Sequence, residues 1–522
     1  MQTLRDGVPG HPMTRTHYRP ARNFSRPHVF SRTAMRSILR RSFVRTLLCG
    51  GFAFGLAATA SATNLVGVYR DALAHDPIFR QAHALYMAAR EARPEAFAAL
   101  LPQLTGTAGR TWDHSAGSQG STSSTSTGSP YVFHLPYSEN SNGKQWSLNL
   151  SAPLFSWADW MNLKAADSQV AQAQASYQQA AQNLILRTAT AYFNVLAAVD
   201  TLQAQESSLK AYTLQLQQAL ERFKVGLIAI TDVEQARAAR DTAVANVIIA
   251  KQALANAQDQ LEVITGRQYS TLAEPGSDMP LVMPNPASQS RWVGTALKQN
   301  LTLIASRLGA SAAEYNVRAV FGADLPTISL VASRSYSNDN NNETVFGQVF
   351  HGLGSDINDR QVGIELSMPI FSGGGDLARI HQAQYQSIAA DDAVDEASRT
   401  TVQQTRDAYL GVITGIANVR ALRQALKSSE TAYAATSAGY KVGTQTEVDV
   451  LNALSVLVQA RTNYATSRYS YINSVIQLQY AAGILGPDEV QVIDRWLTKR
   501  VPVSPGEITP SAMTPPPAPQ SH

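Results

Sequence analysis

Apolar residues recur with a helical period over most of this 522-residue chain. Two stretches without proline, residues 158–222 and 376–439, predict helices of about 65 residues, or about 100 Å at 1.5 Å per residue. Shorter helical stretches flank them at about 64–98, 229–265, 288–320 and 446–482. The apolar residues of one stretch alternate between spacings of four and three, as in a coiled-coil seam: Ala243, Val247, Ala250, Leu254, Ala257 and Leu261. Long packed helices are therefore predicted to dominate the fold.

Four other segments alternate between apolar and polar residues, as half-buried strands do. The alternation is strict in residues 146–151 ("WSLNLS") and 362–367 ("VGIELS"). It is looser in residues 103–112 and 327–336, which carry Trp112 and Tyr336 near their far ends. Alternating segments of about ten residues with aromatic ends are typical of membrane-spanning barrel strands. The polar stretches within each pair, at 114–143 and 338–359, are predicted to be long extracellular loops.

The whole pattern occurs twice along the chain. "LPQL" at 101–104 recurs as "LPTI" at 325–328, and "APLFS" at 152–156 recurs as "MPIFS" at 368–372. Each copy has the order helix, strand, strand, helix, helix. The predicted domains are two repeats, 63–284 and 285–497, and a Pro-rich tail, 498–522, that is expected to be disordered.

Four lipid-facing strands cannot form a barrel alone. In a bilayer every backbone N–H and C=O group needs a partner within the protein, so an open sheet edge is forbidden. Small closed barrels need about eight strands. The chain is therefore predicted to share its barrel with copies of itself, in a closed cyclic assembly. Three chains would supply twelve strands, although the residues alone do not select three.

The N-terminal residues differ in charge from the rest of the chain. Residues 1–62 hold ten arginines and one acid, whereas the remainder has 33 basic and 38 acidic residues, a net charge of −5. The arginines, an apolar run from Thr46 to Ala58 and the small residues 60–62 predict a secretory signal peptide over 1–62. Met35 is the expected true start. Arg40 and Arg41 also fit a twin-arginine signal, but an ordinary basic leader is the preferred interpretation.

Other classes of function find no support in the residues. Because the leader accounts for the basic pI, the charge does not predict nucleic-acid binding. The ten histidines lack ligand spacing and no nucleophile motif occurs, so we expect no metal site, no cofactor and no enzymatic activity. Cys49, the only cysteine, lies in the leader, so no disulfide is predicted. No later apolar run reaches about 18 residues, which argues against a transmembrane helix.

One turn is built twice, as "FKVGLIAITDV" at 223–233 and "YKVGTQTEVDV" at 440–450. If the strands lie in a membrane, each turn lies at the distal tip of a helical hairpin, where the glycine is free to take a positive φ. The predicted tip residues are Val225, Gly226, Leu227, Val442, Gly443 and Thr444. Asp232 and Asp449 follow, and each would form a ring of carboxylates in a cyclic assembly, which attracts cations. An acid in the first turn of a helix is also favoured by the helix dipole alone.

"TATAYFNVLAAVDTL", "RFKVGLIAITDVEQARA" and "AGYKVGTQTEVDVLNA", in the duplicated element order, closely resemble the TolC family of outer-membrane efflux and type I secretion channels. The resemblance covers residues 64 to about 497. It implies a mixed α and β fold: a homotrimer with a 12-stranded β-barrel in the outer membrane and a 12-helix α-barrel in the periplasm. It also implies docking to a periplasmic adaptor (a membrane fusion protein) and to an inner-membrane RND or ABC transporter.

The resemblance further implies a periplasmic gate in which tip residues hold neighbouring hairpins together. Matched by position, these residues are Thr231, Asp232, Tyr440, Gln445, Asp449 and Asn452. Gln445 replaces the family's arginine and Asn452 replaces a second aspartate. A neutral glutamine cannot form the charge-assisted hydrogen bond of an arginine, which is about twice as strong. We therefore expect a looser gate, with Asp449 and Glu447 providing the remaining negative field.

Two other classes of function were weighed. A periplasmic coiled-coil scaffold or adaptor would not explain four alternating segments with aromatic ends. A surface adhesin with a barrel anchor would carry a long passenger region, which this sequence lacks. The predicted function is therefore an outer-membrane exit duct. The residues do not distinguish drugs from polypeptides as cargo.

Overall fold

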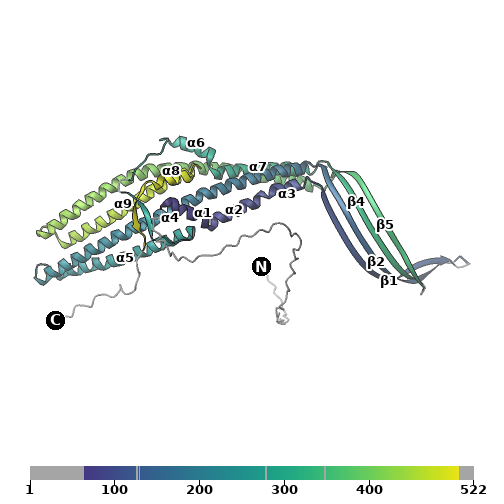
Figure 1. Ribbon diagram of the computed structural model, residues 1–522, viewed down its shortest axis with the longest axis horizontal. Coiled ribbons are helices and arrows are strands. Elements are labelled where there is room, and N and C mark those ends of the chain that lie inside the picture. Colours follow the sequence, from purple (N-terminus) through teal and green to yellow (C-terminus); the bar gives the residue numbers. More distant parts are fainter. Residues whose placement is uncertain (1–63, 125–126, 129, 277–278, 346–347, 505–522) are drawn as a thin grey trace, which may run out of the picture. The chain divides into compact units, whose positions relative to one another are not determined.

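The computed structural model describes residues 64–504, apart from residues 125–126, 129, 277–278 and 346–347 (Figure 1). The predicted signal peptide, with Met35 and Cys49, lies outside the described residues, as do residues 505–522 of the tail. Within the described ranges, no helix has both the length and the apolar character needed to cross a membrane.

Two very long helices form the framework: α4 (Trp157–Lys224, 68 residues) and α8 (Gly375–Lys441, 67 residues). Each is followed by a shorter helix that packs back along it, α5 (Ile230–Thr265) and α9 (Glu447–Ala481), so two helical hairpins result (Figure 1). All six residues of the predicted seam lie on the buried face of α5. The helices predicted for these four stretches are confirmed to within two residues at each end.

The other two helical stretches are interrupted, so the single helices expected there are wrong. The first comprises α1 (Leu65–His75), α2 (Pro77–Arg90) and α3 (Ala92–Ala98), and the second comprises α6 (Gln289–Gln299) and α7 (Leu301–Gly322). Asp76 precedes a proline, which disfavours helical backbone at that position, and its carboxylate caps α2. Asn300 is extended in the same way and its side chain accepts a hydrogen bond from the N–H of Leu303.

Four long antiparallel strands form one sheet in the order β1-β2-β4-β5. They are β1 (Gln103–Ser124), β2 (Pro130–Phe155), β4 (Thr327–Val345) and β5 (Gln348–Ser367). The strands β1 and β5 stand at the two ends of this sheet and have a strand neighbour on one side only. The described chain alone thus leaves two open sheet edges.

The long loops expected at 114–143 and 338–359 are wrong, because these stretches continue the strands. The ladder between β1 and β2 runs without interruption from Gln103↔Ser151 to Ser124↔Pro130. Strand pairing needs only backbone N–H and C=O groups, so Ser-, Thr- and Asn-rich segments extend a ladder that apolar segments begin. The apolar alternation therefore identifies only the part of each strand nearest the helices, and each strand continues beyond it.

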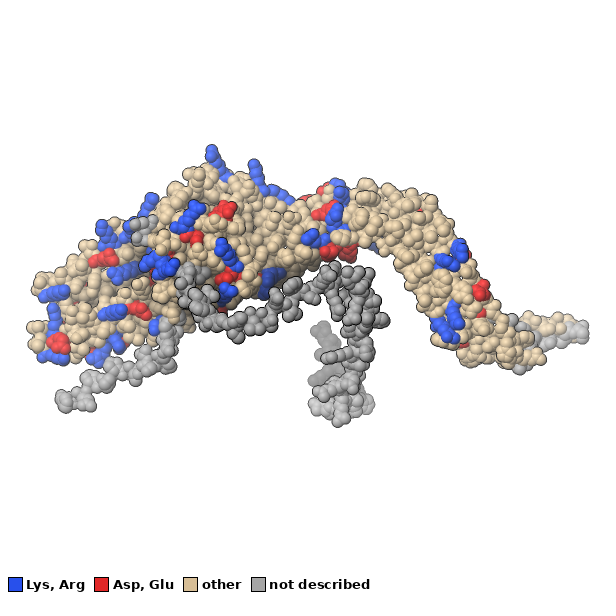
Figure 2. Space-filling model, in the orientation of Figure 1, with Lys and Arg blue, Asp and Glu red and all other residues tan. Residues whose placement is uncertain are grey.

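The two faces of the sheet differ in polarity over the residues nearest the helices. Register places Leu104 opposite Leu150, Leu150 opposite Ala332 and Ala332 opposite Val362, so one face is apolar. On the other face Thr107 and Ser147 share a hydrogen bond of 2.9 Å between their hydroxyl oxygens. Figure 2 shows few charged side chains on the part of the sheet next to the helices. This pattern confirms the predicted alternation.

A second, small sheet joins the ends of the two repeats, and no pattern in the sequence predicted it. Strand β3 (Thr271–Pro275) pairs antiparallel with β6 (Leu497–Pro502), which follows the short helix α10 (Pro487–Asp494). The tail was expected to be disordered from residue 498, and for residues 498–502 this is wrong. Tyr192, fully buried on α4, donates a hydrogen bond of 2.6 Å to the carbonyl of Ala273 and accepts one from its N–H. The sheet is thereby fixed to the longest helix.

A buried polar cluster holds α9 against α4 and this sheet. The Tyr469 hydroxyl donates to Asp200 at 2.8 Å, and the Arg468 guanidinium donates to the carbonyls of Pro275 and Gly276. Lys499 pairs with the buried Glu274 at 2.5 Å. Burial raises the pKa of Asp200, and the hydrogen bond from Tyr469 offsets part of this rise. Protonation of Asp200 thus links the stability of this cluster to pH.

Replacing Asp200 by Asn should change how stability depends on pH. Because the folded-state pKa of Asp200 is raised, its contribution is fully present below the unfolded-state pKa and is lost as pH rises through the folded-state pKa. The free energy of unfolding of Asp200→Asn should therefore decline less than that of the wild type as pH rises above about 4, the ordinary pKa of an aspartate. Chemical denaturation across this range measures the difference. Asp259→Asn, an exposed carboxylate on α5, is the control, and equal pH slopes in all three proteins would contradict the prediction.

Candidate functional site

The two hairpin tips end their long helices with the same backbone geometry. Gly226 has φ 75° and Gly443 has φ 81°, a left-handed conformation that favours glycine. The N–H groups of Leu227 and Thr444 donate to the carbonyls of Arg222 and Gly439, closing the last turn of α4 and of α8. The positive φ predicted for both glycines is confirmed.

The tips expose apolar side chains. Val225, Leu227 and Val442 are 69%, 72% and 76% exposed, and Gly226, Gly443 and Thr444 around them are exposed as well. Large apolar side chains exposed to this degree on neighbouring turns form a surface suited to contact with another protein. The first tip is supported from beneath by Ala219, Val233 and Ala236, which are buried together.

The two predicted ring aspartates differ in their surroundings. Asp449 is exposed and belongs to a capping box: its carboxylate accepts from the N–H of Thr446 at 2.9 Å and from the Thr446 hydroxyl at 2.6 Å. The hydrogen bond from the Thr446 side chain is the main cause that lowers the pKa of Asp449, so this carboxylate stays ionised. Asp232 is half-buried, and the cap of its helix is Ala229, whose side chain cannot bond. Asp449 is thus the better fixed of the two charges.

The two hairpins contact each other through four residues, of which the sequence singled out Tyr440 and Glu447 but not Gln215 and Arg222. Glu447 is only 3% exposed, and its carboxylate accepts a hydrogen bond of 2.7 Å from the amide of Gln215 on α4. The Arg222 guanidinium lies 4.1 Å from the centre of the buried Tyr440 ring. Burial, followed by the neighbouring Glu447 carboxylate, raises the pKa of Tyr440 to about 12. We call Gln215, Arg222, Tyr440 and Glu447 the tip cluster.

The structure thus brings together only part of the predicted gate. Tyr440 lies in the tip cluster, but Thr231, Gln445 and Asn452 are exposed. In the described part of the chain these three side chains make no hydrogen bond or ion pair. Glu447 is buried, so the expectation that it adds to an exposed negative field is wrong. Gln215 and Arg222 were missed because the sequence shows only that they are seven residues apart. This spacing places both on one face of a helix, and it is too common to identify a site.

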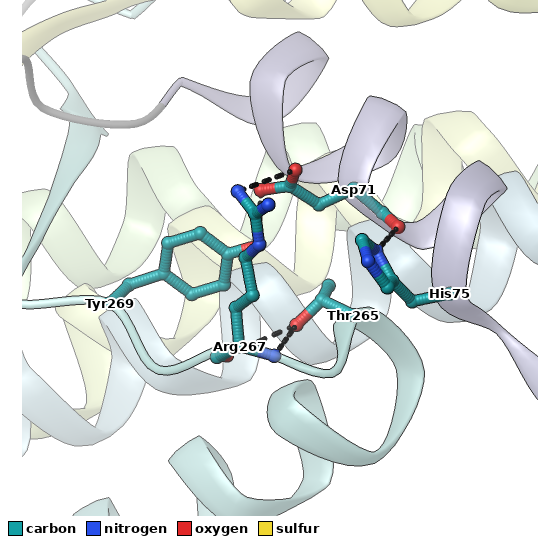
Figure 3. Close-up of polar contacts among 5 residues, drawn as sticks. All are labelled: Asp71, His75, Thr265, Arg267 and Tyr269. Carbon is teal, nitrogen blue, oxygen red and sulfur yellow. Dashed lines mark hydrogen bonds and ion pairs between the residues drawn. The ribbon is translucent and has the colours of Figure 1, made fainter.

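A second cluster of polar side chains lies where α1 meets the end of α5 (Figure 3). Asp71 pairs with Arg267 at 3.3 Å and accepts from the Tyr269 hydroxyl at 3.0 Å. Arg267 and Tyr269 also line a cavity of about 530 Å³ next to β3. Burial raises the pKa of Tyr269 to about 12. These contacts fix the chain after α5, and among the described residues no group of acids and histidines is arranged to hold a metal ion.

Comparisons with known proteins agree with the duplicated architecture. The family model described as outer membrane efflux protein matches residues 68–267 and 292–484, one stretch in each repeat. Outer membrane protein TolC of Escherichia coli (strain K12) is 33% identical over 474 residues, covering 89% of this chain and 91% of that protein. The alkaline protease secretion protein AprF of Pseudomonas aeruginosa is 27% identical and covers 86% of this chain and 90% of its own.

Solved structures show the same fold. The outer membrane channel CmeC of Campylobacter jejuni has a TM-score of 0.64 at 20% identity, covering 83% of this chain and 90% of that one. The outer membrane protein VceC of Vibrio cholerae has a TM-score of 0.63 at 19% identity, covering 80% and 96%. The predicted resemblance to TolC channels is confirmed, and the chain belongs to the outer membrane efflux protein family.

Proposed function

We propose that this chain is the outer-membrane exit duct of a tripartite export system. The duct passes small toxic compounds, type I secreted proteins or both from an inner-membrane pump to the exterior. One observation carries the proposal: a single chain of this family joins a sheet with one apolar face to two long helical hairpins. The protein lies in the outer membrane, with its helices in the periplasm.

The assembly is a homotrimer. The open edges at β1 and β5 must each find a partner in lipid, and three protomers give twelve strands in a closed barrel. The helices also have unpartnered apolar side chains, such as Leu85 on α2 and Tyr385 and Ile388 on α8, at 63%, 73% and 55% exposure. A neighbouring protomer buries these side chains and continues the tunnel through the periplasm.

The hairpin tips form the gate. Three copies of Asp449 surround the threefold axis, with Thr231, Asp232, Gln445 and Asn452 at the contacts between protomers. Within a protomer, the tip cluster links the first hairpin to the second through the bond from Gln215 to Glu447. Because Gln445 is uncharged, the contact between protomers lacks a charge-assisted hydrogen bond. The bond from Gln215 to the buried Glu447 therefore contributes more to holding the gate closed. The exposed residues Val225, Leu227 and Val442 dock the periplasmic adaptor.

Membrane fractionation and electrical recording test the duct itself. The mature protein should sediment with the outer membrane, migrate as a trimer that dissociates on heating, and conduct ions in planar bilayers. A stable single-chain species in detergent, or a protein recovered in the soluble periplasmic fraction, would contradict the proposal. The second outcome would indicate the scaffold function instead.

Single-channel recording of Asp449→Ala tests the ring of charges. Because the variant removes three ionised carboxylates from one constriction, affinity for blocking divalent cations should fall by about tenfold or more, and cation selectivity should fall with it. Asp449→Asn should act alike, since it keeps the side chain and loses the charge. Asp449→Glu retains the charge and serves as the control. Unchanged divalent block in the alanine and asparagine variants would remove Asp449 from the gate.

A double-mutant cycle tests the link between hairpins. Gln215→Ala and Glu447→Ala should each raise the resting conductance. The double variant should raise it by less than the sum, with a coupling of about 1.5–3 kcal/mol, the range for a hydrogen bond to a charged group. The control pair is Arg461→Ala and Glu430→Ala, whose ion pair of 3.3 Å lies within the second hairpin. If both cycles give additive effects, Glu447 does not hold the gate.

A further inference from the structure

A basic residue lies near the end of the apolar face on every strand of the sheet. These residues are Arg110, Lys144, Arg334 and Arg360, all exposed, one each on β1, β2, β4 and β5. Each is an even number of positions from an apolar residue of its strand, so it points to the same face as Leu104, Leu150, Ala332 and Val362. We call these four residues the basic row.

The basic row places like charges directly opposite each other. Arg110 is the register partner of Lys144, and Arg334 is the register partner of Arg360. Directly opposed like charges destabilise a strand pair unless an anion lies between them. Within the described part of the sheet, none of the four takes part in an ion pair. The face also carries Asp356, in the same register row as Lys144, whereas Asp113, Asp339 and Asp359 occupy odd positions on the opposite face.

Aromatic side chains accompany the basic row. The Arg110 guanidinium lies 4.6 Å from the Trp112 ring, and that of Arg334 lies 5.7 Å from the Trp146 ring. Trp146 in turn stacks with Tyr336 at 6.4 Å. Tryptophan and tyrosine concentrate where a membrane meets water. The basic row therefore lies where the lipid-facing band ends.

The same arrangement is present in both repeats. Arg110 follows "LPQL" at the same spacing as Arg334 follows "LPTI". Lys144 precedes "APLFS" at the same spacing as Arg360 precedes "MPIFS". These motifs are the ones that define the repeat. The opposed pair therefore occupies equivalent positions in the two halves of the sheet, despite the many differences between the halves.

We propose that the basic row binds the phosphate groups of the lipid that forms the outer leaflet of the outer membrane. The inference rests on the outer-membrane barrel assigned above. Arg110, Arg334 and Arg360 each lie seven positions from the helix-side end of their strand. Seven residues span about 23 Å along a strand at 3.3 Å per residue, which at a tilt of about 40° is a height of about 18 Å, most of the roughly 25 Å apolar band of outer-membrane barrels. Long arginine and lysine side chains extend from this height to the outer surface. There, planar guanidinium groups match phosphate oxygens in pairs.

Lipid titration of the purified trimer tests the site, with native mass spectrometry to count bound lipid. The probes are lipid A with two phosphates, the same lipid with one phosphate, and inorganic phosphate alone. Wild-type protein should bind the bisphosphorylated lipid most tightly, and millimolar inorganic phosphate should not displace it. Equal affinity for the two lipids, or full displacement by inorganic phosphate, would overturn the proposal without any variant being needed.

Variants locate the binding. Arg110→Gln with Lys144→Gln, and Arg334→Gln with Arg360→Gln, should each weaken binding, by about fivefold per cation removed near an anionic lipid surface. The control is Arg420→Gln with Arg423→Gln, two arginines on α8, far along the chain from the sheet. If the basic-row variants lose no more affinity for the bisphosphorylated lipid than the control variant does, the proposal is overturned. Retained trimer and conductance in the variants separate failure of lipid binding from failure of the duct.

Discussion

The structure depends above all on the backbone hydrogen bonds of its four-stranded sheet. Water can satisfy the free edges of a sheet in a soluble protein, but lipid offers no donor or acceptor. The strands β1 and β5 each keep one unpaired side within the chain. Closure by identical subunits satisfies both edges at once, and it also imposes cyclic symmetry on everything attached to the strands. The proposed tunnel and the proposed ring of aspartates both depend on this single requirement.

Charge is used in opposite ways at the two ends of the molecule. At the tips one carboxylate, Asp449, is exposed and held ionised by its capping box, whereas two positions earlier Glu447 is buried against Gln215. The first can act on ions in solution, and the second can act only on the neighbouring hairpin. On the sheet the basic row stands at the border of an apolar face without paired carboxylates. Burial and neighbours, rather than residue type, decide what each charge does.

Periodicity predicted the parts of the fold in which one local pattern persists over many residues. The ends of α4, α5, α8 and α9 were correct because their apolar spacing runs unbroken between clear turn residues. The polar extensions of the strands were missed because the backbone hydrogen bonds of a ladder do not require any particular side chain, so these segments show no apolar alternation. The small sheet of β3 and β6 was missed as well, because one strand lies near the end of each repeat and no local pattern links the two. At the tips the glycines were predictable from their turn, but the contact of Gln215 with Glu447 joins two hairpins and is invisible locally.

Duplication explains how the two repeats share one framework and yet differ at the proposed gate. Equivalent positions keep the roles that geometry demands, such as the positive φ of Gly226 and Gly443 or the helix-capping Asp76 and Asn300. Positions free of that demand have diverged: Ala229 leaves Asp232 without a side-chain cap, whereas Thr446 fixes Asp449. In the proposed trimer, each such difference is present three times around the axis. The two hairpins therefore share one framework, while a capping box fixes the aspartate of the second hairpin alone.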